Sequence, residues 1–217
     1  MKPSIALFIH HPECSKDCCD GMIQALSPKY NITLFTEAEC SIDKLQPFDI
    51  VAFPGGIGDS TESYNRFFRR RAQQAVADYV EQGGRYLGVC MGAYWAGSYY
   101  FDILDGVDAV QYIKQPTADI RRPYSTVAPV TWMGTDQEAF FYDGCTFVGD
   151  DSKFTTIATY ANNQPMAIIQ NRIGLIGCHL ESTKHWYQKP RKYISSKWHN
   201  GLHHLLLLDF VDHLMAK

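Results

Sequence analysis

Four short apolar segments within residues 1–90 constrain the fold more than any other feature of this sequence. They are SIALFI (4–9), NITLFT (31–36), DIVAFPGG (49–56) and RYLGV (85–89). Helical patterns lie between them, around residues 18–26 and from Tyr64 to Gln82, where Gly83 and Gly84 end the second. Apolar strands that alternate with helices predict a parallel sheet covered by helices on both faces.

The second half of the chain follows a different pattern. Strand-like segments lie at 125–132, 154–160, 165–170 and 173–178, and Asn171-Arg172 predicts a tight hairpin between the last two. The C-terminal segment 200–217 predicts a closing helix. We therefore expect one α/β domain over residues 1–217, a flavodoxin-like parallel sheet with helices on both faces and β-rich additions in the second half.

Charge and hydropathy exclude several partners. The chain carries 20 basic and 23 acidic residues, so its net charge of −3 argues against nucleic acid or a membrane surface as a partner. No segment approaches the roughly 18–20 apolar residues of a membrane span. The N-terminal IALFI is shorter than the about 7–15 apolar residues of a signal-peptide core. We expect a cytoplasmic protein whose seven cysteines are mostly free thiols.

The segment YLGVCMGAYWAG (86–97) places Cys90 where a strand must turn sharply into a helix. Gly88 and Gly92 remove Cβ atoms that would clash in such a turn, as in the Gly-x-Ser-x-Gly elbow of hydrolases. The turn predicts an exposed thiol at a helix N-terminus, where the thiolate is favoured. The backbone N–H of Met91 would then face a developing oxyanion.

Two further segments complete a candidate catalytic group. After the third strand, Gly55 and Gly56 let the backbone approach a ligand, and an N–H of Gly56 or Ile57 could complete an oxyanion hole. In CHLES (178–182), we expect an extended strand, so that His179 and Glu181 point to the same face. A cysteine nucleophile needs such an imidazole as its base and a carboxylate to orient the ring.

These motifs carry a family resemblance. FPGGIGDS (53–60), GGRYLGVCMGAYWAG (83–97) and GLIGCHLES (174–182) resemble the class I glutamine amidotransferase-like superfamily. Within it, the sequence is most similar to the N-terminal domain of biotin-protein ligases and its stand-alone bacterial relatives. The resemblance implies Cys90 as nucleophile, His179 and Glu181 as the His-x-Glu pair, and Gly56 and Met91 at the oxyanion positions.

The sequence also departs from the superfamily pattern. Tyr94 stands where glutamine-using members carry Gln, so we place it at the pocket wall and do not expect glutamine as the substrate. Met91 stands where the peptidase branch carries His. The Gly-Arg-Gly-Arg loop of the ligase half is absent, so we do not expect biotinylation by this chain.

Two hypotheses of function follow. In the first, the chain is a cysteine-dependent amidase, acyl hydrolase or amidotransferase-like enzyme acting on a small-molecule or peptide amide or ester. In the second, it is a non-catalytic ligand-binding or regulatory module. A partner protein or a homo-oligomer is compatible with both, and neither requires a cofactor.

Other polar residues receive weaker interpretations. Glu13 is a candidate auxiliary carboxylate beside the thiol. The nearby His10, His11, Cys14, Cys18 and Cys19 match no strong metal-binding spacing, and no metal site is predicted, although a redox pair among these cysteines stays open. His199 and His203 are four residues apart on the predicted last helix and are expected at the surface.

Overall fold

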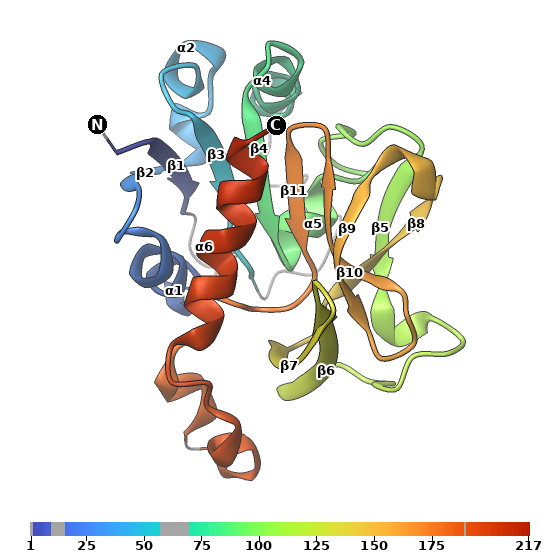
Figure 1. Ribbon diagram of the computed structural model, residues 1–217. Coiled ribbons are helices and arrows are strands. Elements are labelled where there is room, and N and C mark those ends of the chain that lie inside the picture. The colour runs from blue at the N-terminus through green and yellow to red at the C-terminus, as the bar shows by residue number, and fades with distance from the viewer. Residues whose placement is uncertain (1, 10–15, 57–69, 189) are drawn as a thin grey trace.

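The computed structural model describes residues 2–9, 16–56, 70–188 and 190–217 (Figure 1). A nine-stranded sheet has the order β2-β1-β3-β4-β11-β10-β9-β6-β7. The five strands from β2 to β11 pair in parallel in the flavodoxin-like order. They are β1 (Ser4–Phe8), β2 (Asn31–Phe35), β3 (Ile50–Phe53), β4 (Arg85–Val89) and β11 (Ile173–Ile176).

The antiparallel strands extend this sheet beyond β11. They are β10 (Pro165–Gln170), β9 (Thr155–Tyr160), β6 (Thr126–Trp132) and β7 (Thr135–Phe141). Gln170 pairs with Ile173, which places Asn171 and Arg172 in the predicted hairpin turn. Asn171 takes φ = 51°, a left-handed conformation that asparagine tolerates. A separate two-stranded sheet pairs β5 (Val107–Gln111) with β8 (Cys145–Gly149).

Helices cover both faces of the parallel strands. On one face α1 (Lys16–Leu26) contacts α6 (Leu202–Met215), and on the other α2 (Ile42–Leu45) contacts α4 (Arg70–Glu81). Ile5 and Leu7 of β1 enter the core with α1 and α6, whereas Ala6 and Phe8 enter the core with α4. This two-sided burial is why β1 is apolar from Ile5 to Phe8.

Shorter helical segments connect the larger elements. They are α5 (Met91–Trp95) and the 3-10 segments Glu37–Glu39, Tyr112–Lys114, Asp151–Lys153, Lys184–Tyr187 and Lys192–Lys197. The expected fold class is confirmed, including β-rich additions that precede the last core strand. The part of the predicted Tyr64–Gln82 helix before Arg70 lies outside the described residues.

Three strands, β5, β7 and β8, were not predicted. Thr135, Asp136 and Glu138 of β7 are exposed, because β7 is an edge of the large sheet. Such a strand lacks the continuous apolar pattern of the central strands. Strand β7 therefore forms because its backbone pairs with β6, and no simple sequence pattern predicts that pairing.

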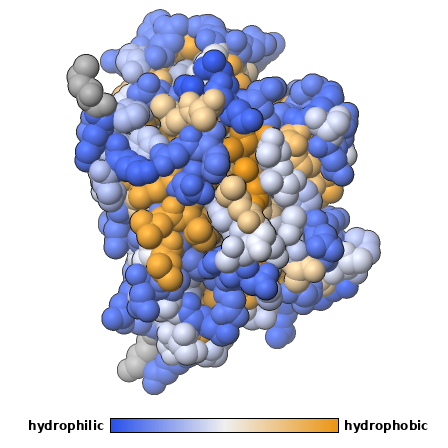
Figure 2. All heavy atoms as spheres, viewed as in Figure 1, coloured by the Kyte–Doolittle hydropathy of each residue, from blue (hydrophilic) through white to orange (hydrophobic). Residues whose placement is uncertain are grey.

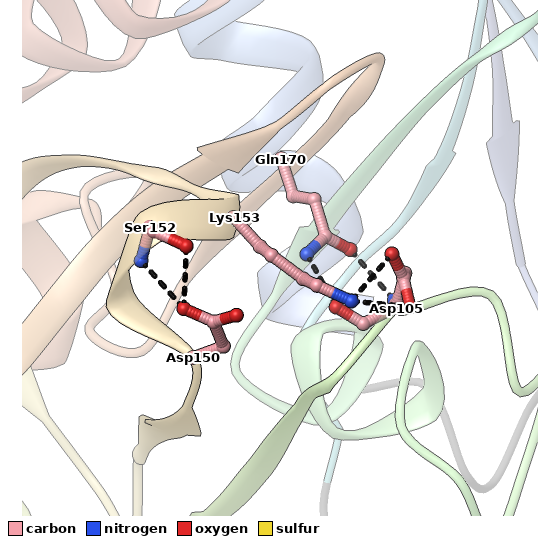
Figure 3. Close-up of polar contacts among 5 residues, drawn as sticks. All are labelled: Asp105, Asp150, Ser152, Lys153 and Gln170. Atoms are coloured by element: carbon pink, nitrogen blue, oxygen red, sulfur yellow. Dashed lines mark hydrogen bonds and ion pairs between the residues drawn. The ribbon is translucent and has the colours of Figure 1, made fainter.

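A polar network holds the start of β5 against the main sheet (Figure 3). The buried side chain of Gln170 accepts a hydrogen bond from the Asp105 amide at 2.9 Å and donates to the Asp105 carbonyl at 3.0 Å. Lys153 contacts the Asp105 carboxylate at 2.8 Å. The Asp150 carboxylate accepts from the amide and the hydroxyl of Ser152. These contacts fix the position of the small β5–β8 sheet beside β10.

The interpretation of His199 and His203 as surface residues is wrong. Both are buried, their rings stack with centroids 3.9 Å apart, and the His199 ring contacts the Ser182 hydroxyl. Burial lowers the pKa of His199 to about 3 and that of His203 to about 4, with further lowering by neighbouring histidines. These histidines therefore belong to the packing beneath the start of α6.

The outer face of α6 is partly apolar. Leu202 and Leu205 are exposed large hydrophobic residues of this helix. Figure 2, viewed from the same side as Figure 1, shows hydrophobic atoms near the middle of a mostly hydrophilic face. Among the described residues, no helix is long and apolar enough to span a membrane.

Candidate active site

Cys90 lies at the carboxyl end of β4, in a turn that leads directly into α5. Its backbone has φ = 49° and ψ = −104°, a region that residues with a side chain rarely adopt. The Cys90 amide donates to the Ile176 carbonyl at 2.8 Å, which ties the turn to β11. Strain of this kind persists where the surrounding structure imposes it, and it is concentrated at functional sites.

The two glycines beside Cys90 are required by close backbone packing. A Cβ atom on Gly88 would lie 2.4 Å from the carbonyl oxygen of Gly92. A Cβ atom on Gly92 would lie 2.1 Å from the carbonyl oxygen of Phe53 at the end of β3. The steric reason that the sequence suggested for these glycines therefore holds in the folded chain.

His179 and Glu181 follow β11 and form a buried pair. His179 Nδ1 and Glu181 Oε1 are 2.8 Å apart, and the two residues are 4% and 0% exposed. The sequence interpretation assumed that the strand continues through Glu181, and this was wrong. The strand ends at Ile176, and the two side chains meet through the turn that follows it. The His179 amide donates to the Phe140 carbonyl at 2.8 Å and fixes the start of this turn.

The elbow and the His179–Glu181 pair meet at one edge of the sheet. Val89 of β4 is paired with Ile176 of β11, so the residues that follow both strands emerge together. Burial opposes a charged His179 ring, but the negative charges of Cys90 and Glu181 outweigh it and raise the pKa of His179 well above its usual value. Hydrogen bonds to Cys18 and Cys90 act in the same direction. Nδ1 of the ring is the nitrogen that faces Glu181.

The Gly55-Gly56 loop lies against the same imidazole. A Cβ atom on Gly55 would approach His179 Cε1 to 2.6 Å and Cys18 Sγ to 2.9 Å. Gly56 lines a cavity together with His179. Met91 is the first residue of α5, and the amides of a first helical turn have no partner within the helix.

A cavity of about 200 Å³ opens above the His179 ring. Its lining residues are Asp17, Cys18, Gly56, Ser125, Phe140, Tyr142, His179, Trp186 and Arg191. At its rim, Arg191 Nε donates to Ser125 Oγ at 2.8 Å, and His185 contacts Asp17 at 3.1 Å. Cys90 is 5% exposed and is not among the lining residues, and its Sγ lies 3.8 Å from the Tyr142 carbonyl oxygen.

Other candidate residues have different positions from those expected. Tyr94 donates to the Asp143 carbonyl at 3.2 Å and packs on the core that contains α5, and it does not line this cavity. The aromatic lining comes instead from Phe140, Tyr142 and Trp186, which the sequence analysis did not single out. Ile57 and Glu13 lie outside the described residues, as do His10, His11 and Cys14.

Cys18 is the functional candidate that the sequence left unassigned. It lies in the first turn of α1, is 4% exposed, and is hydrogen-bonded to His179. Burial raises the pKa of the Cys18 thiol to about 11, although the hydrogen bond to His179 acts against this shift. Its presence in a cysteine-rich segment after the first strand was the available signal. Its contact with a residue near the other end of the chain was not predictable from spacing.

Comparisons with known proteins agree with the predicted resemblance. The family model "Biotin-protein ligase, N terminal" matches residues 10–106. No significant match was found among curated proteins. Among solved structures, a glutamine amidotransferase from Thermotoga maritima has a TM-score of 0.70 at 11% identity, with 100% of each chain covered.

Two further structures share the fold across almost the whole chain. A chain of PurLQS from Thermotoga maritima has a TM-score of 0.61 at 13% identity, with 96% of this chain and 99% of its own covered. A glutamine amidotransferase from Methylobacillus flagellatus has a TM-score of 0.59 at 14% identity and covers 100% of this chain and 93% of its own. At these identities the likeness establishes the fold and not the reaction.

Proposed function

We propose that this chain, which has the glutamine amidotransferase-like fold and a segment matching the biotin-protein ligase N-terminal family, is a cysteine-dependent amidase or acyl transferase. Cys90 is the nucleophile, His179 the general base and acid, and Glu181 the residue that orients His179. The observation that carries the proposal is the buried 2.8 Å contact of His179 with Glu181, beside a strained turn that presents Cys90. The substrate is an amide or ester small enough to enter through the cavity above His179.

The reaction follows from this arrangement. His179 Nε2 first accepts the proton of the Cys90 thiol, and the resulting thiolate attacks the carbonyl carbon. The negative charge that develops on the carbonyl oxygen is stabilised by the amides of Met91 and Gly56. His179 then gives the proton to the leaving amine or alcohol, and a thioester remains on Cys90. Water or an acceptor amine attacks the thioester, loses its proton to His179, and releases the acyl group and the thiol.

Glu181 has a defined part in each step. Its carboxylate accepts the Nδ1 hydrogen and therefore selects the tautomer in which Nε2 is free to receive a proton. It also stabilises the imidazolium that forms when the Cys90 proton moves to His179. The burial of Glu181 at 0% exposure strengthens this interaction by excluding water.

One experiment tests the proposal directly. The protein is treated with amide- and ester-based activity probes, and the acylated peptide is identified by mass spectrometry. We expect acylation at Cys90, and a rate at least about 100-fold lower in His179→Ala. His213→Ala is the matched control, because His213 lies on α6 and pairs with Asp209. Equal labelling of Cys90 in wild type and His179→Ala would remove His179 from the mechanism.

The coverage of Cys90 favours a second candidate function. Cys90 is 5% exposed and does not line the cavity, so a ligand can occupy the cavity without touching Cys90. In that case the chain is a binding or regulatory module that keeps the scaffold without turnover. Unchanged ligand binding or partner regulation in Cys90→Ala, together with no probe labelling of the wild type, would support this function over the first.

A further inference from the structure

Three side chains that can bind a metal ion, Cys18, His179 and Glu181, lie together in the interior of the protein. Ligand atoms of Cys18, His179 and Glu181 all lie within 4.8 Å of one another. The three residues come from the first turn of α1 and from the turn after β11. The ring edge that carries Nδ1 and Cε1 and the Cys18 Sγ both border Gly55, where an added Cβ would lie within 3.1 Å of all three atoms.

The Glu181 carboxylate has unused capacity at this point. Its Oε1 pairs with His179, but its Oε2 is fully buried and has no hydrogen-bond partner among the described residues. A buried carboxylate oxygen without a partner is costly in the absence of a ligand. This orphaned atom is an observation independent of the clustering, and it leaves one Glu181 oxygen available to a ligand.

We propose that Cys18, His179 and Glu181 bind Zn²⁺ and that this ion switches off the Cys90 mechanism. A thiolate, an imidazole and a carboxylate are ligands that Zn²⁺ accepts together, whereas Mg²⁺ and Ca²⁺ require oxygen ligands. Bonds of about 2.0–2.3 Å in a tetrahedron place ligand atoms roughly 3.5 Å apart, so small side-chain movements close the site. Cys18 and His179 line the cavity, which gives the ion an entry path and a fourth position for water.

The inhibition follows from the tautomer of His179 and rests on the proposed function. A metal ion on Nδ1 replaces the Nδ1 hydrogen, and the Cys18 thiol loses its proton to solvent as it coordinates. A neutral imidazole that is bound through Nδ1 carries its hydrogen on Nε2. It then has no lone pair to accept the proton of Cys90. Zn²⁺ and acylation of Cys90 therefore exclude each other.

Co²⁺ binding tests the site without any measurement of activity. Chelator-treated protein is titrated with Co²⁺, and the absorption from the thiolate ligand to Co²⁺ is recorded. We expect one equivalent to bind and Zn²⁺ to displace it. The absorption should be lost in Cys18→Ser and retained in Cys19→Ser, a neighbouring buried cysteine of α1, and in Cys90→Ser.

Three results would overturn the site: no absorption in wild type, absorption that survives in Cys18→Ser, or absorption lost in Cys90→Ser. Urea unfolding checks that each variant folds. If Cys18→Ser does not fold, Glu181→Gln replaces it and must weaken Co²⁺ binding by more than about tenfold. Unchanged affinity in Glu181→Gln would equally overturn the site.

A second measurement separates the metal site from the proposed reaction. Zn²⁺ should slow acylation of Cys90 in wild type and in Cys19→Ser, a chelator should restore it, and Cys18→Ser should resist the ion. Absence of acylation in metal-free protein would contradict the proposed function and leave the Co²⁺ result standing. Acylation that Zn²⁺ does not slow, in protein shown to bind Co²⁺, would overturn the inhibitory role.

Discussion

Gly55 lies directly against the ring of His179, so that a methyl group on its Cα would come within 2.6 Å of Cε1. The same methyl group would come within 2.9 Å of Cys18 Sγ. Gly55 therefore limits where both the imidazole and Cys18 Sγ can lie. Because Gly55 has no side chain, the Gly55-Gly56 loop leaves room for the His179 ring.

Substitution of Gly55 tests this relationship. We expect Gly55→Ala to displace His179 and to lower probe acylation of Cys90 by at least about tenfold, since small misplacements at a reacting centre are costly. Overpacking should lower the free energy of unfolding by about 1–3 kcal/mol. Acylation kinetics and urea unfolding measure the two effects.

Gly134→Ala is the control for stability alone. A Cβ there meets no atom within 4 Å, but its φ of +82° strains alanine. It should lose about 1 kcal/mol of stability and keep full acylation. Loss of acylation in proportion to stability in both variants would contradict a positioning role for Gly55.

The strained backbone at Cys90 gives a prediction about stability. At φ = 49° and ψ = −104°, glycine is free of the steric conflict that any side chain creates. We expect Cys90→Gly to be more stable than Cys90→Ala by about 1 kcal/mol, as measured by urea unfolding. An alanine variant at least as stable as the glycine variant would show that the turn is unstrained.

The network around Asp105 separates buried from exposed polar contacts. Gln170 is 2% exposed and satisfies both backbone groups of Asp105, so Gln170→Leu should cost roughly 2–4 kcal/mol of unfolding free energy. Lys153→Met removes only an ion pair whose Asp105 side chain is 77% exposed, and it should cost under about 1 kcal/mol. Denaturant unfolding of the two variants measures the contrast, and equal losses would contradict it.

The buried histidine cluster predicts a loss of stability in acid. The pKa values of His199 and His203 are about 3 and about 4 in the folded protein, below the ordinary value of 6.5. Between pH 6.5 and these values the unfolded chain binds protons that the folded chain does not bind. Stability is therefore complete above pH 6.5 and falls with decreasing pH, by up to about 1.4 kcal/mol per pH unit for each histidine.

Unfolding free energies measured from pH 7 to pH 4 check this prediction. His203→Gln should reduce the slope, because it removes one of the groups that the unfolded chain protonates. Three titratable side chains, His199, His204 and Glu138, surround His203. His204 lowers the pKa of His203, whereas the negative charge of Glu138 raises it. An identical slope in wild type and His203→Gln would sink the prediction.

The sequence by itself determined the parallel core and the elbow. Strands buried on both faces must be apolar throughout, so β1, β3 and β4 were visible as local patterns. The flanking glycines of Cys90 were equally visible, because a sharp turn excludes Cβ atoms wherever it occurs. Both are consequences of residues that lie close together in the chain.

Tertiary structure alone decided the surroundings of that elbow. Cys18 meets His179 only because α1 packs beside the turn after β11, where Gly21 lies against the Glu181 backbone. The burial of Cys90 and the burial of His203 have the same origin. Contacts between distant segments depend on how helices and sheets pack, and no spacing of residues along the chain encodes them.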